Sequence, residues 1–456
     1  MRQHALFPID DLPLWKERLL HWAAEQELAV YLDSNGHEGD QPTGKGWECL
    51  VAAGALRILE CPAGNAFEQL KKFQAEVNDW IFGFLSYDLK NETERLSSQH
   101  FDGIGLPELG FFQPEIVLGI RNGFLEIFYI NKDINQFFGT FKTFDKKVLK
   151  NTLSGKNVLN PRIHKDDYLK TVQQIREHIA EGDLYEMNLC QEFFAERTSI
   201  DPVSVFARLN QIGLAPASAF LRWRDRYLMS ASPERFLQKQ GDRLVSQPIK
   251  GTRKRGATGQ EDHAIRAELA TNEKDRAENV MIVDLVRNDL ARHCLPGSVQ
   301  VEELFGIHTF ETVHQMISTV SGVLRPDAHP VDALRAAFPM GSMTGAPKVM
   351  AMQLIEHYEK TRRGLYSGAV GYFNPSGDFD FNVVIRSLLY NASSQYVSAQ
   401  VGGAIVYDSV PEAEYEECLL KLEAMQRALY QEVRSERVRD IPLGIWRYFG
   451  VGFSGL

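Results

Sequence analysis

Two predicted helices in the C-terminal half of the sequence carry glutamates suited to binding a metal ion. The stretch 272–292 reads as a helix with one inward apolar face, formed by Met281, Ile282 and Leu285. Glu278 precedes these residues by three, four and seven positions and therefore shares their face. A carboxylate buried there needs a partner or a proton. The ordinary explanation would be an internal salt bridge to Arg276 or Arg287.

The second helix is expected to begin at Pro411. Glu414, Glu417 and Lys421 then follow at helical spacing on one face. Glu417 and Lys421 alone could form a solvated ion pair worth about 0.2–0.5 kcal/mol. Together with Glu278, however, Glu417 supplies hard oxygen ligands of the kind that Mg²⁺ uses beside water and an anionic substrate. The pattern therefore indicates a small carboxylate or phosphate as the ligand.

A predicted hairpin brings a lysine close to a glutamate. Residues 235–247 read as two strands, and opposed residues in such a pair have a constant sum of indices. A three-residue loop at 241–243 places Glu234 opposite Lys250, whereas a two-residue turn places them on opposite faces. A cross-strand ion pair is the ordinary reading. The catalytic reading is a nucleophilic amine beside its proton donor.

These residues belong to one of two differently built regions. Residues 1–150 form a β-rich region, in which Asn122-Gly123 is a strong signal for a two-residue hairpin. The polar, turn-rich segment 151–162 is the expected boundary. Helices and short strands alternate over 163–432, beginning with a helix that ends before Gly182. Residues 433–456 form a tail without an interpretable pattern.

The composition is that of a globular protein, with 456 residues, of which 44% are hydrophobic and 24% charged. A net charge of −10, without a long basic run, argues against nucleic acid or an anionic membrane as a partner. The sequence shows no signal-peptide pattern and no uninterrupted apolar run of about 18 residues, so a cytoplasmic location is expected. Five scattered cysteines form no CxxC pair, and any metal is therefore expected on oxygen ligands.

Six motifs resemble those of the chorismate-utilising enzymes, a family that includes anthranilate synthase component I and the isochorismate synthases. They are PIKGTRKRG (248–256), NEKDRAENVMIVDLVRNDL (272–290), FPMGSMTGAPK (338–348), RRGLYSGAVGYF (362–373), VVIRSLL (383–389) and GGAIVYDSVPEAEYEECLLK (402–421). The resemblance spans about residues 165–430, and YLDSNG (31–36) and WIFGFLSYDL (80–89) resemble the N-terminal region of amine-transferring members. It implies an α+β fold of two intertwined β-sheet layers, flanked by helices, with a central cleft.

The resemblance further implies that Lys250 is a nucleophile and Glu234 its general acid. Lysine in the PIKGT motif marks the members that aminate chorismate at C4, whereas anthranilate synthases carry alanine there. The implied product of chorismate and ammonia is 4-amino-4-deoxychorismate, on the route to 4-aminobenzoate and folate. Ammonia is expected from a separate glutaminase subunit. The alternatives are anthranilate synthesis with the lysine tolerated, and a non-catalytic subunit that only regulates a glutaminase.

The same resemblance implies a Mg²⁺ site and a substrate site. Glu278 and Glu417 correspond to metal ligands, with Asp275 and Glu414 near the metal. Thr252 and Ser342, in segments of small and hydroxyl-bearing residues, suit the close approach of a ligand. The remaining expected substrate contacts are Arg386, whose guanidinium can bind a carboxylate bidentately, and Tyr366, Gly402, Gly403, Ala404 and Lys421.

Three places in the sequence depart from the family pattern. Glu186 stands where amine-transferring enzymes commonly carry glutamine and isochorismate synthases carry a lysine that activates water. His314-Gln315 occupies a place where relatives often have histidine second, and Ala404 replaces a usual glycine. The roles of Glu186, His314 and Gln315 stay open. In some relatives the N-terminal half binds tryptophan, and YLDSNG could line such a pocket.

Overall fold

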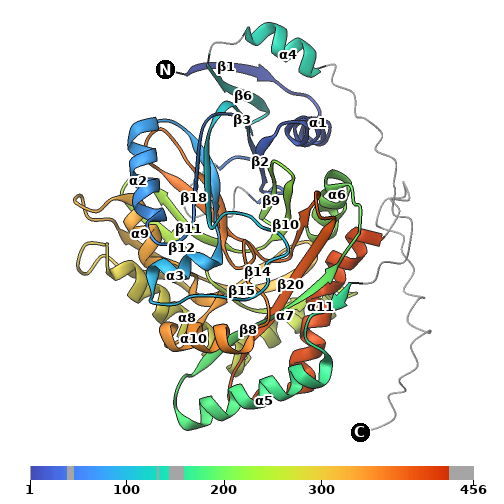
Figure 1. Ribbon diagram of the computed structural model, residues 1–456, viewed down its shortest axis with the longest axis vertical. Helices are drawn as coiled ribbons and strands as arrows, with labels where there is room; N and C mark the ends of the chain where they lie inside the picture. The colour runs from blue at the N-terminus through green and yellow to red at the C-terminus, as the bar shows by residue number, and fades with distance from the viewer. Residues whose placement is uncertain (1, 38–45, 131–132, 143–158, 431–456) are drawn as a thin grey trace.

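The computed structural model describes residues 2–37, 46–130, 133–142 and 159–430. The expected boundary at 151–162 lies mostly outside these ranges, and the tail at 433–456 lies wholly outside them. Figure 1 shows strands through the middle of the molecule and helices around them. Within the described ranges, no helix is both long and apolar enough to cross a membrane.

The N-terminal region is built mainly of strands. These are β1 (Gln3–Pro8), β2 (Leu28–Asp33), β3 (Cys49–Cys61), β4 (Ile81–Leu85), β5 (Leu109–Arg121) and β6 (Phe124–Tyr129). The helices are α1 (Leu12–Glu25), α2 (Ala66–Val77), the short 3₁₀ helix η2 (Tyr87–Leu89), α3 (Lys90–Thr93) and α4 (Ile134–Lys142). Asn122 and Gly123 join β5 to β6 with φ angles of 53° and 74°. The two-residue hairpin is therefore confirmed.

The rest of the chain alternates helices and strands. The strands are β7 (Asn160–Pro161), β8 (Glu186–Ala195), β9 (Ala217–Trp223), β10 (Arg226–Ser232), β11 (Arg235–Gln240), β12 (Arg243–Ser246), β13 (Ile249–Lys254), β14 (Gln300–Thr309), β15 (Val313–Val323), β16 (Gly345–Ala346), β17 (Ala369–Phe373), β18 (Phe379–Val383), β19 (Ser387–Asn391) and β20 (Tyr396–Ile405). The helices are α5 (Lys165–Glu181), α6 (Pro202–Gly213), α7 (Gly259–Thr271), α8 (Glu273–Ala291), α9 (Pro330–Ala337), η3 (Gly341–Met343), α10 (Lys348–Tyr358) and α11 (Pro411–Tyr430).

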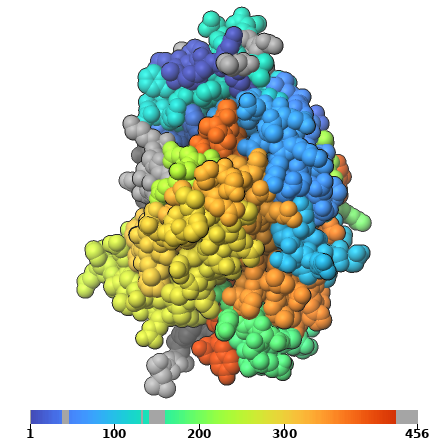
Figure 2. All heavy atoms as spheres, turned by 90° about the vertical axis from the view of Figure 1, so that its left-hand side faces the viewer, coloured from blue at the N-terminus to red at the C-terminus, as the bar shows by residue number. Residues whose placement is uncertain are grey.

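Strands from the two regions pair with one another. β2 pairs antiparallel with β9, and β4 pairs antiparallel with β17. In Figure 2 the blue N-terminal residues lie directly against the orange residues of the last third of the chain. The mixture of helices with a large antiparallel sheet agrees with the predicted α+β class, and the sheet runs through both regions.

Two hydrophobic cores lie on the two faces of the sheet. In β2, Leu28 and Val30 enter one core, whereas Ala29 and Tyr31 enter the other. Successive side chains of a strand point to opposite faces, so a strand that is buried on both faces must be apolar at nearly every position. This explains the continuous apolar run at the start of β2.

Three predicted helix ends are confirmed. The side chain of Asn272 caps α8 by accepting a hydrogen bond from the backbone N–H of Asp275 at 3.0 Å. α11 begins at Pro411. α5 ends at Gly182, whose φ of +88° is the left-handed conformation that glycine adopts readily at a helix C-terminus. Two of these helices, α8 and α11, carry acidic residues discussed below.

Candidate active site

Lys250 lies at a β-bulge in β13. The pairing of β13 with β15 shifts register between Ile249 and Thr252, and Gly251 has a φ of +83°. A bulge redirects a side chain relative to a regular strand. A Cβ on Gly251 would lie 2.9 Å from a methyl carbon of Leu269 and 3.0 Å from the carboxyl carbon of Asp275, so the close packing of β13 requires glycine there.

The Lys250 side chain is only 10% exposed and faces carboxylates. Its Nζ donates a hydrogen bond to Oε1 of Glu186 and lies 3.8 Å from Oε2 of Glu278. Burial alone would lower the pKa of Lys250, but the charges of Glu186 and Glu278 outweigh burial, so the pKa lies above its usual value. Lys250 is therefore held as an ammonium in the absence of a substrate.

Glu234 immediately precedes β11 and is 5% exposed. Its carboxylate accepts a hydrogen bond from Ser342 Oγ at 2.7 Å and another from the backbone N–H of Ile249. Burial raises the pKa of Glu234 to about 7, although the Ser342 hydrogen bond and the Lys250 charge oppose that rise. A carboxyl group with such a pKa can donate a proton near neutral pH.

The route by which Glu234 and Lys250 approach differs from the predicted one. The turn between β11 and β12 has two residues, because Gln240 is paired with Arg243. Of the two turns considered from the sequence, the two-residue turn is therefore present and the three-residue loop at 241–243 is not. After Pro248 the chain continues as β13 and pairs with β15. The bulge in β13 then brings Lys250 within electrostatic reach of Glu234.

Glu278 lies on the partly buried face of α8, as predicted, with a side chain 12% exposed. Its ionic partners are Lys250 and Lys274, the latter at 3.9 Å between Nζ and Oε1. The partners considered from the sequence are wrong, because Arg287 pairs with Asp284 and Arg276 lies over the ring of Phe305. Burial raises the pKa of Glu278 to about 7, since the Lys250 charge offsets only part of the desolvation.

The acidic residues of α11 face β20 and α8. A Cβ on Gly403 would lie 3.3 Å from Oε2 of Glu414 and 3.4 Å from Oε1 of Glu417. Lys274 of α8 is close enough to act electrostatically on both glutamates as well as on Glu278. The acids of the two helices therefore share one cationic neighbour. The carboxylate oxygens of Glu414 and Glu417 lie beside Gly403, which has no side chain, and carboxylate oxygens are of the chemical type that Mg²⁺ binds.

The remaining acidic residue expected near the metal has another partner. Asp275 Oδ2 lies 2.7 Å from a guanidinium nitrogen of Arg253. Glu414 is 5% exposed and accepts a hydrogen bond from Ser409 Oγ at 2.7 Å. Glu414 thus keeps one oxygen toward Gly403, whereas Asp275 is engaged in a salt bridge beside Gly251.

Several expected substrate contacts cluster near Glu417. Arg386 is close enough to interact electrostatically with both Tyr366 and Glu417. Lys421 Nζ lies 2.6 Å from Glu417 Oε1 and donates a hydrogen bond to the Gly402 carbonyl at 2.6 Å. The helical ion pair predicted between Glu417 and Lys421 is therefore present, and it reaches the backbone of β20, where Ala404 also lies.

The structure separates the two residues of the His314-Gln315 pair. His314 faces Asp262, with 2.9 Å between Nε2 and Oδ1. Gln315 lies opposite Thr252 in the β13–β15 pair and donates a long hydrogen bond to its hydroxyl at 3.5 Å. Thr252 itself is exposed. Gln315 therefore lies beside Thr252, which is an expected substrate contact, whereas His314 points toward Asp262.

Two contacts were not identified from the sequence. Ser342 binds the Glu234 carboxylate, whereas the sequence suggested a substrate contact only. Glu186 binds Lys250, and its departure from the family pattern was the only signal in the sequence. Both contacts join strands or loops far apart in the chain, which no local spacing reveals.

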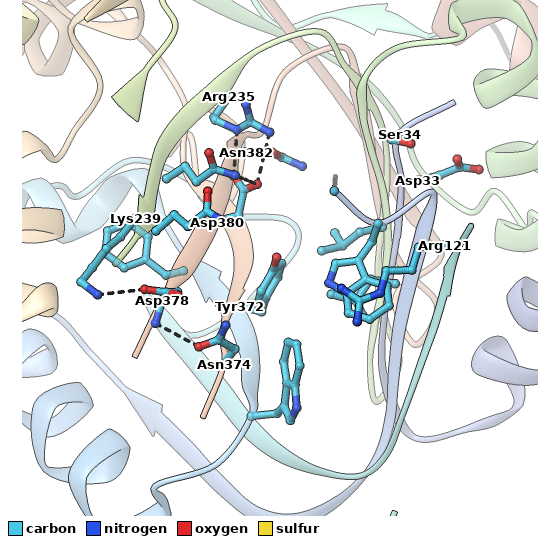
Figure 3. A pocket seen from close by; sticks show the side chains of 18 of the residues that line it. Asp33, Ser34, Arg121, Arg235, Lys239, Tyr372, Asn374, Asp378, Asp380 and Asn382 are labelled. Atoms are coloured by element: carbon cyan, nitrogen blue, oxygen red, sulfur yellow. Dashed lines mark hydrogen bonds and ion pairs between the residues drawn. The ribbon is translucent and has the colours of Figure 1, made fainter. Parts of the chain in front are cut away.

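Away from these residues lies a cavity of about 370 Å³, which we call the second cavity because it is a second candidate site. Asp33 and Ser34 of the YLDSNG segment line it, together with the aromatic side chains of Trp47, Trp80, Phe128 and Tyr372. Figure 3 shows Arg235 with Asp380 and Lys239 with Asp378 on one wall, opposite Arg121 and Ser34. The cavity is thus built from both the N-terminal and the C-terminal regions.

Solved structures define the class of fold. Anthranilate synthase component I from Streptococcus pneumoniae aligns with a TM-score of 0.74 at 26% identity, covering 83% of this chain and 92% of that chain. The menaquinone-specific isochorismate synthase MenF from Escherichia coli aligns with a TM-score of 0.72 at 17% identity, over 94% and 95% of the two chains. The fold is therefore anthranilate synthase component I-like, as predicted.

The family follows from the sequence comparison. The model of the chorismate binding enzyme family matches residues 27–427, so this chain belongs to that family. Component 1 of aminodeoxychorismate synthase from Klebsiella aerogenes is 38% identical over 350 residues, 76% of each chain. The chloroplastic aminodeoxychorismate synthase of Arabidopsis thaliana is 36% identical over 452 residues, 93% of this chain and 48% of that protein. This chain thus spans about half the length of the plant relative.

Proposed function

We propose that this chain has the activity of aminodeoxychorismate synthase component 1, which converts chorismate and ammonia to 4-amino-4-deoxychorismate and water. The observation that carries the proposal is a buried amine, Lys250, within electrostatic reach of a carboxyl group, Glu234, whose pKa is raised to about 7. The relatives that share most of this chain bear the same name. Lysine at position 250, where anthranilate synthases carry alanine, favours this activity over anthranilate synthesis.

In the first half of the proposed reaction, the Lys250 ammonium first loses a proton to solvent, and the neutral amine then forms a bond from Nζ to C2 of chorismate. The ring double bond shifts and the bond from C4 to its hydroxyl breaks. Glu234 gives its proton to the departing hydroxyl, which leaves as water. Glu234 becomes a carboxylate close to the positively charged adduct, and this attraction stabilises the intermediate.

In the second half, ammonia bonds to C4, the double bond shifts back and the bond between Lys250 and C2 breaks. The new ammonium group at C4 loses one proton, which the Glu234 carboxylate takes up. Lys250 is released as a neutral amine and takes a proton back from solvent, and Glu234 is again a carboxyl group, so atoms and charges balance. One difficult substitution is divided into two easier ones, which is the general advantage of a covalent nucleophile.

The acidic residues would hold a divalent cation next to the substrate. Glu278 and Glu417 are the proposed Mg²⁺ ligands, with Glu414 beside them. Bound Mg²⁺ would neutralise a substrate carboxylate. Arg386, Tyr366 and Lys421 are proposed to orient the substrate through its carboxylates, and the bidentate guanidinium is best suited to that task.

The proposed reaction also implies partners. We expect ammonia from a separate glutaminase subunit, consistent with the component 1 name of several relatives. The product would feed 4-aminobenzoate and folate synthesis in the cytoplasm. A pull-down with a candidate glutaminase, followed by a test for glutamine-dependent turnover, would examine this expectation.

The decisive experiment is product analysis with the purified chain, chorismate, ammonium salt and Mg²⁺. We expect chorismate to be consumed, and 4-aminobenzoate to form only when an aminodeoxychorismate lyase is added. Fluorescent anthranilate without the lyase would instead establish anthranilate synthesis. If Mg²⁺ causes no chorismate consumption at all, the catalytic proposal fails in favour of a non-catalytic subunit.

We also propose that the second cavity binds tryptophan, as the resemblance of YLDSNG suggests. The supporting observation is its combination of aromatic walls with charged groups of both signs, which suits an aromatic amino acid (Figure 3). Isothermal titration calorimetry with L-tryptophan should give saturable heat. Wild-type protein without such heat, and without any rise in unfolding temperature at millimolar tryptophan, would contradict the proposal.

A further inference from the structure

Glu186 contacts the proposed nucleophile but has no role in the reaction described above. It is the first residue of β8 and lies opposite Ala346 of β16. Its side chain is 1% exposed, and Oε1 accepts a hydrogen bond from Lys250. Its other oxygen, Oε2, has no hydrogen-bond partner among the described residues. A buried carboxylate in this state is costly, and the cost calls for an explanation.

Glu192, six residues further along β8, shows what a structural carboxylate looks like in this fold. It is 3% exposed, much like Glu186. Its Oε1 accepts a hydrogen bond from Ser398 at 2.7 Å, and its Oε2 accepts two from Arg162 at 2.9 and 3.1 Å. Both oxygens of Glu192 are satisfied, whereas Glu186 interacts through one. Glu186 is therefore poorly explained by stability alone.

The neighbour of Lys250 that competes with Glu186 is Glu278. Its Oε2 lies 3.8 Å from Lys250 Nζ, beyond hydrogen-bond distance but within range of an ion pair. If Glu186 were absent, the ammonium would be attracted to Glu278 alone among its directly contacting carboxylates. Glu278 is also the proposed metal ligand of α8, so a closer Lys250 would occupy the oxygen that the cation needs.

We propose that Glu186 is a positioning residue that holds the Lys250 side chain away from Glu278. The amine is thereby fixed where it can reach the substrate, and the Glu278 carboxylate stays available to a divalent cation. This inference rests on the proposed function for the role of Lys250. Its effect on cation binding, however, can be measured without substrate or turnover.

The test compares three variants of the full chain, Glu186→Ala, Glu186→Gln and the matched control Glu192→Gln. Mn²⁺ binding, followed by electron paramagnetic resonance without substrate, should weaken about tenfold in Glu186→Ala, as is typical when a residue supporting a metal ligand is removed. Glu186→Gln keeps an oxygen that can accept the Lys250 hydrogen bond, and we expect a smaller loss. Glu192→Gln should bind Mn²⁺ like the wild type.

Turnover supplies the second readout. With saturating Mg²⁺, Glu186→Ala should lower kcat about tenfold or more and leave the KM for chorismate within about twofold, because the amine and not the substrate is misplaced.

Unchanged Mn²⁺ affinity in both Glu186 variants would overturn the inference, as would a wild type that binds no Mn²⁺. If Glu186→Ala does not fold, the near-isosteric Glu186→Gln decides alone. If the chain shows no amination activity but its Mn²⁺ binding still depends on Glu186, the proposed function is rejected and the inference about Glu186 is kept.

Discussion

The side-chain cluster around Lys250 and the second cavity both contain buried charges, but these charges are balanced differently in the two regions. In the cavity, Arg235 pairs with Asp380 at 2.9 Å and Lys239 pairs with Asp378 at 3.0 Å. Each of these cations has its own acid. Around Lys250, by contrast, three carboxylates act on one ammonium, and they come from Glu186, Glu234 and Glu278.

This difference supports the proposal that the cluster around Lys250, and not the second cavity, carries the proton and metal chemistry. Paired charges are stable without a ligand, whereas surplus carboxylates need a proton or another cation. The pKa values of Glu234 and Glu278 are accordingly raised to about 7 by burial. Glu234 and Arg235 are neighbours in the chain but take part in different sites, because successive residues of an extended chain point in opposite directions.

The largest expected effect on activity distinguishes Lys250 from Lys239, the lysine of the second cavity. Lys250→Ala should lower aminodeoxychorismate formation by about 10³-fold or more, because it removes the proposed nucleophile. Lys239→Ala, at an equally buried lysine of the second cavity, should keep kcat within about twofold of the wild type, since no reacting group is lost. Product chromatography measures both. Near-normal turnover by Lys250→Ala would remove the nucleophile from the mechanism.

The next comparison concerns the acids. Glu278→Gln should raise the Mg²⁺ concentration for half-maximal activity about tenfold or more, because an amide oxygen is a weaker ligand than a carboxylate. Asp380→Asn, which breaks a charge pair in the second cavity, should leave the Mg²⁺ titration unchanged. Identical titration curves for Glu278→Gln and wild type would show that α8 supplies no metal ligand.

The third prediction concerns pH. Burial raises the pKa of Glu234, so the proton-donating form predominates below about pH 7 and is lost as the pH rises through that value. The neutral fraction of Lys250 grows about tenfold per pH unit below its raised pKa, so at constant free ammonia kcat/KM should rise up to about pH 7 and level off above it, where the loss of protonated Glu234 cancels that gain. Ser342→Ala removes a hydrogen bond that favours the carboxylate, and the pH at which the profile levels off should move higher. A profile that is the same in Ser342→Ala would indicate that another group limits the rate.

The smallest effect is expected at Gly403. A Cβ there would lie 3.3 Å from Glu414 and 3.4 Å from Glu417, so both carboxylates must move by a few tenths of an ångström. Gly403→Ala should raise the Mg²⁺ concentration for half-maximal activity by less than about tenfold. This is at the low end of the effects seen for residues that support metal ligands. Gly377→Ala, where a Cβ would meet no atom within 4 Å, is a control for the Mg²⁺ titration, although its φ of +77° adds local strain. A full loss of activity in Gly403→Ala would mean that the substrate itself occupies this space.

Some elements of the site could be predicted from local sequence because the relevant forces are local. Helical spacing alone placed Glu278 on the inward face of α8, and the turn residues Asn122-Gly123 specified the β5–β6 hairpin. The motifs around Lys250 and Glu417 were sufficient to indicate the family, which the match over residues 27–427 establishes.

The partners of those residues were decided by tertiary structure. The sequence left the turn between β11 and β12 open between two and three residues, and the structure has two. That one-residue difference reverses the face of every following side chain in the strand. The bulge in β13 places the Lys250 ammonium near Glu278. The same ammonium contacts Glu186 of β8, which is 64 positions away in the chain. Such contacts depend on how strands and helices from distant segments pack together. Sequence determined which groups could react, and long-range packing decided which of them face one another.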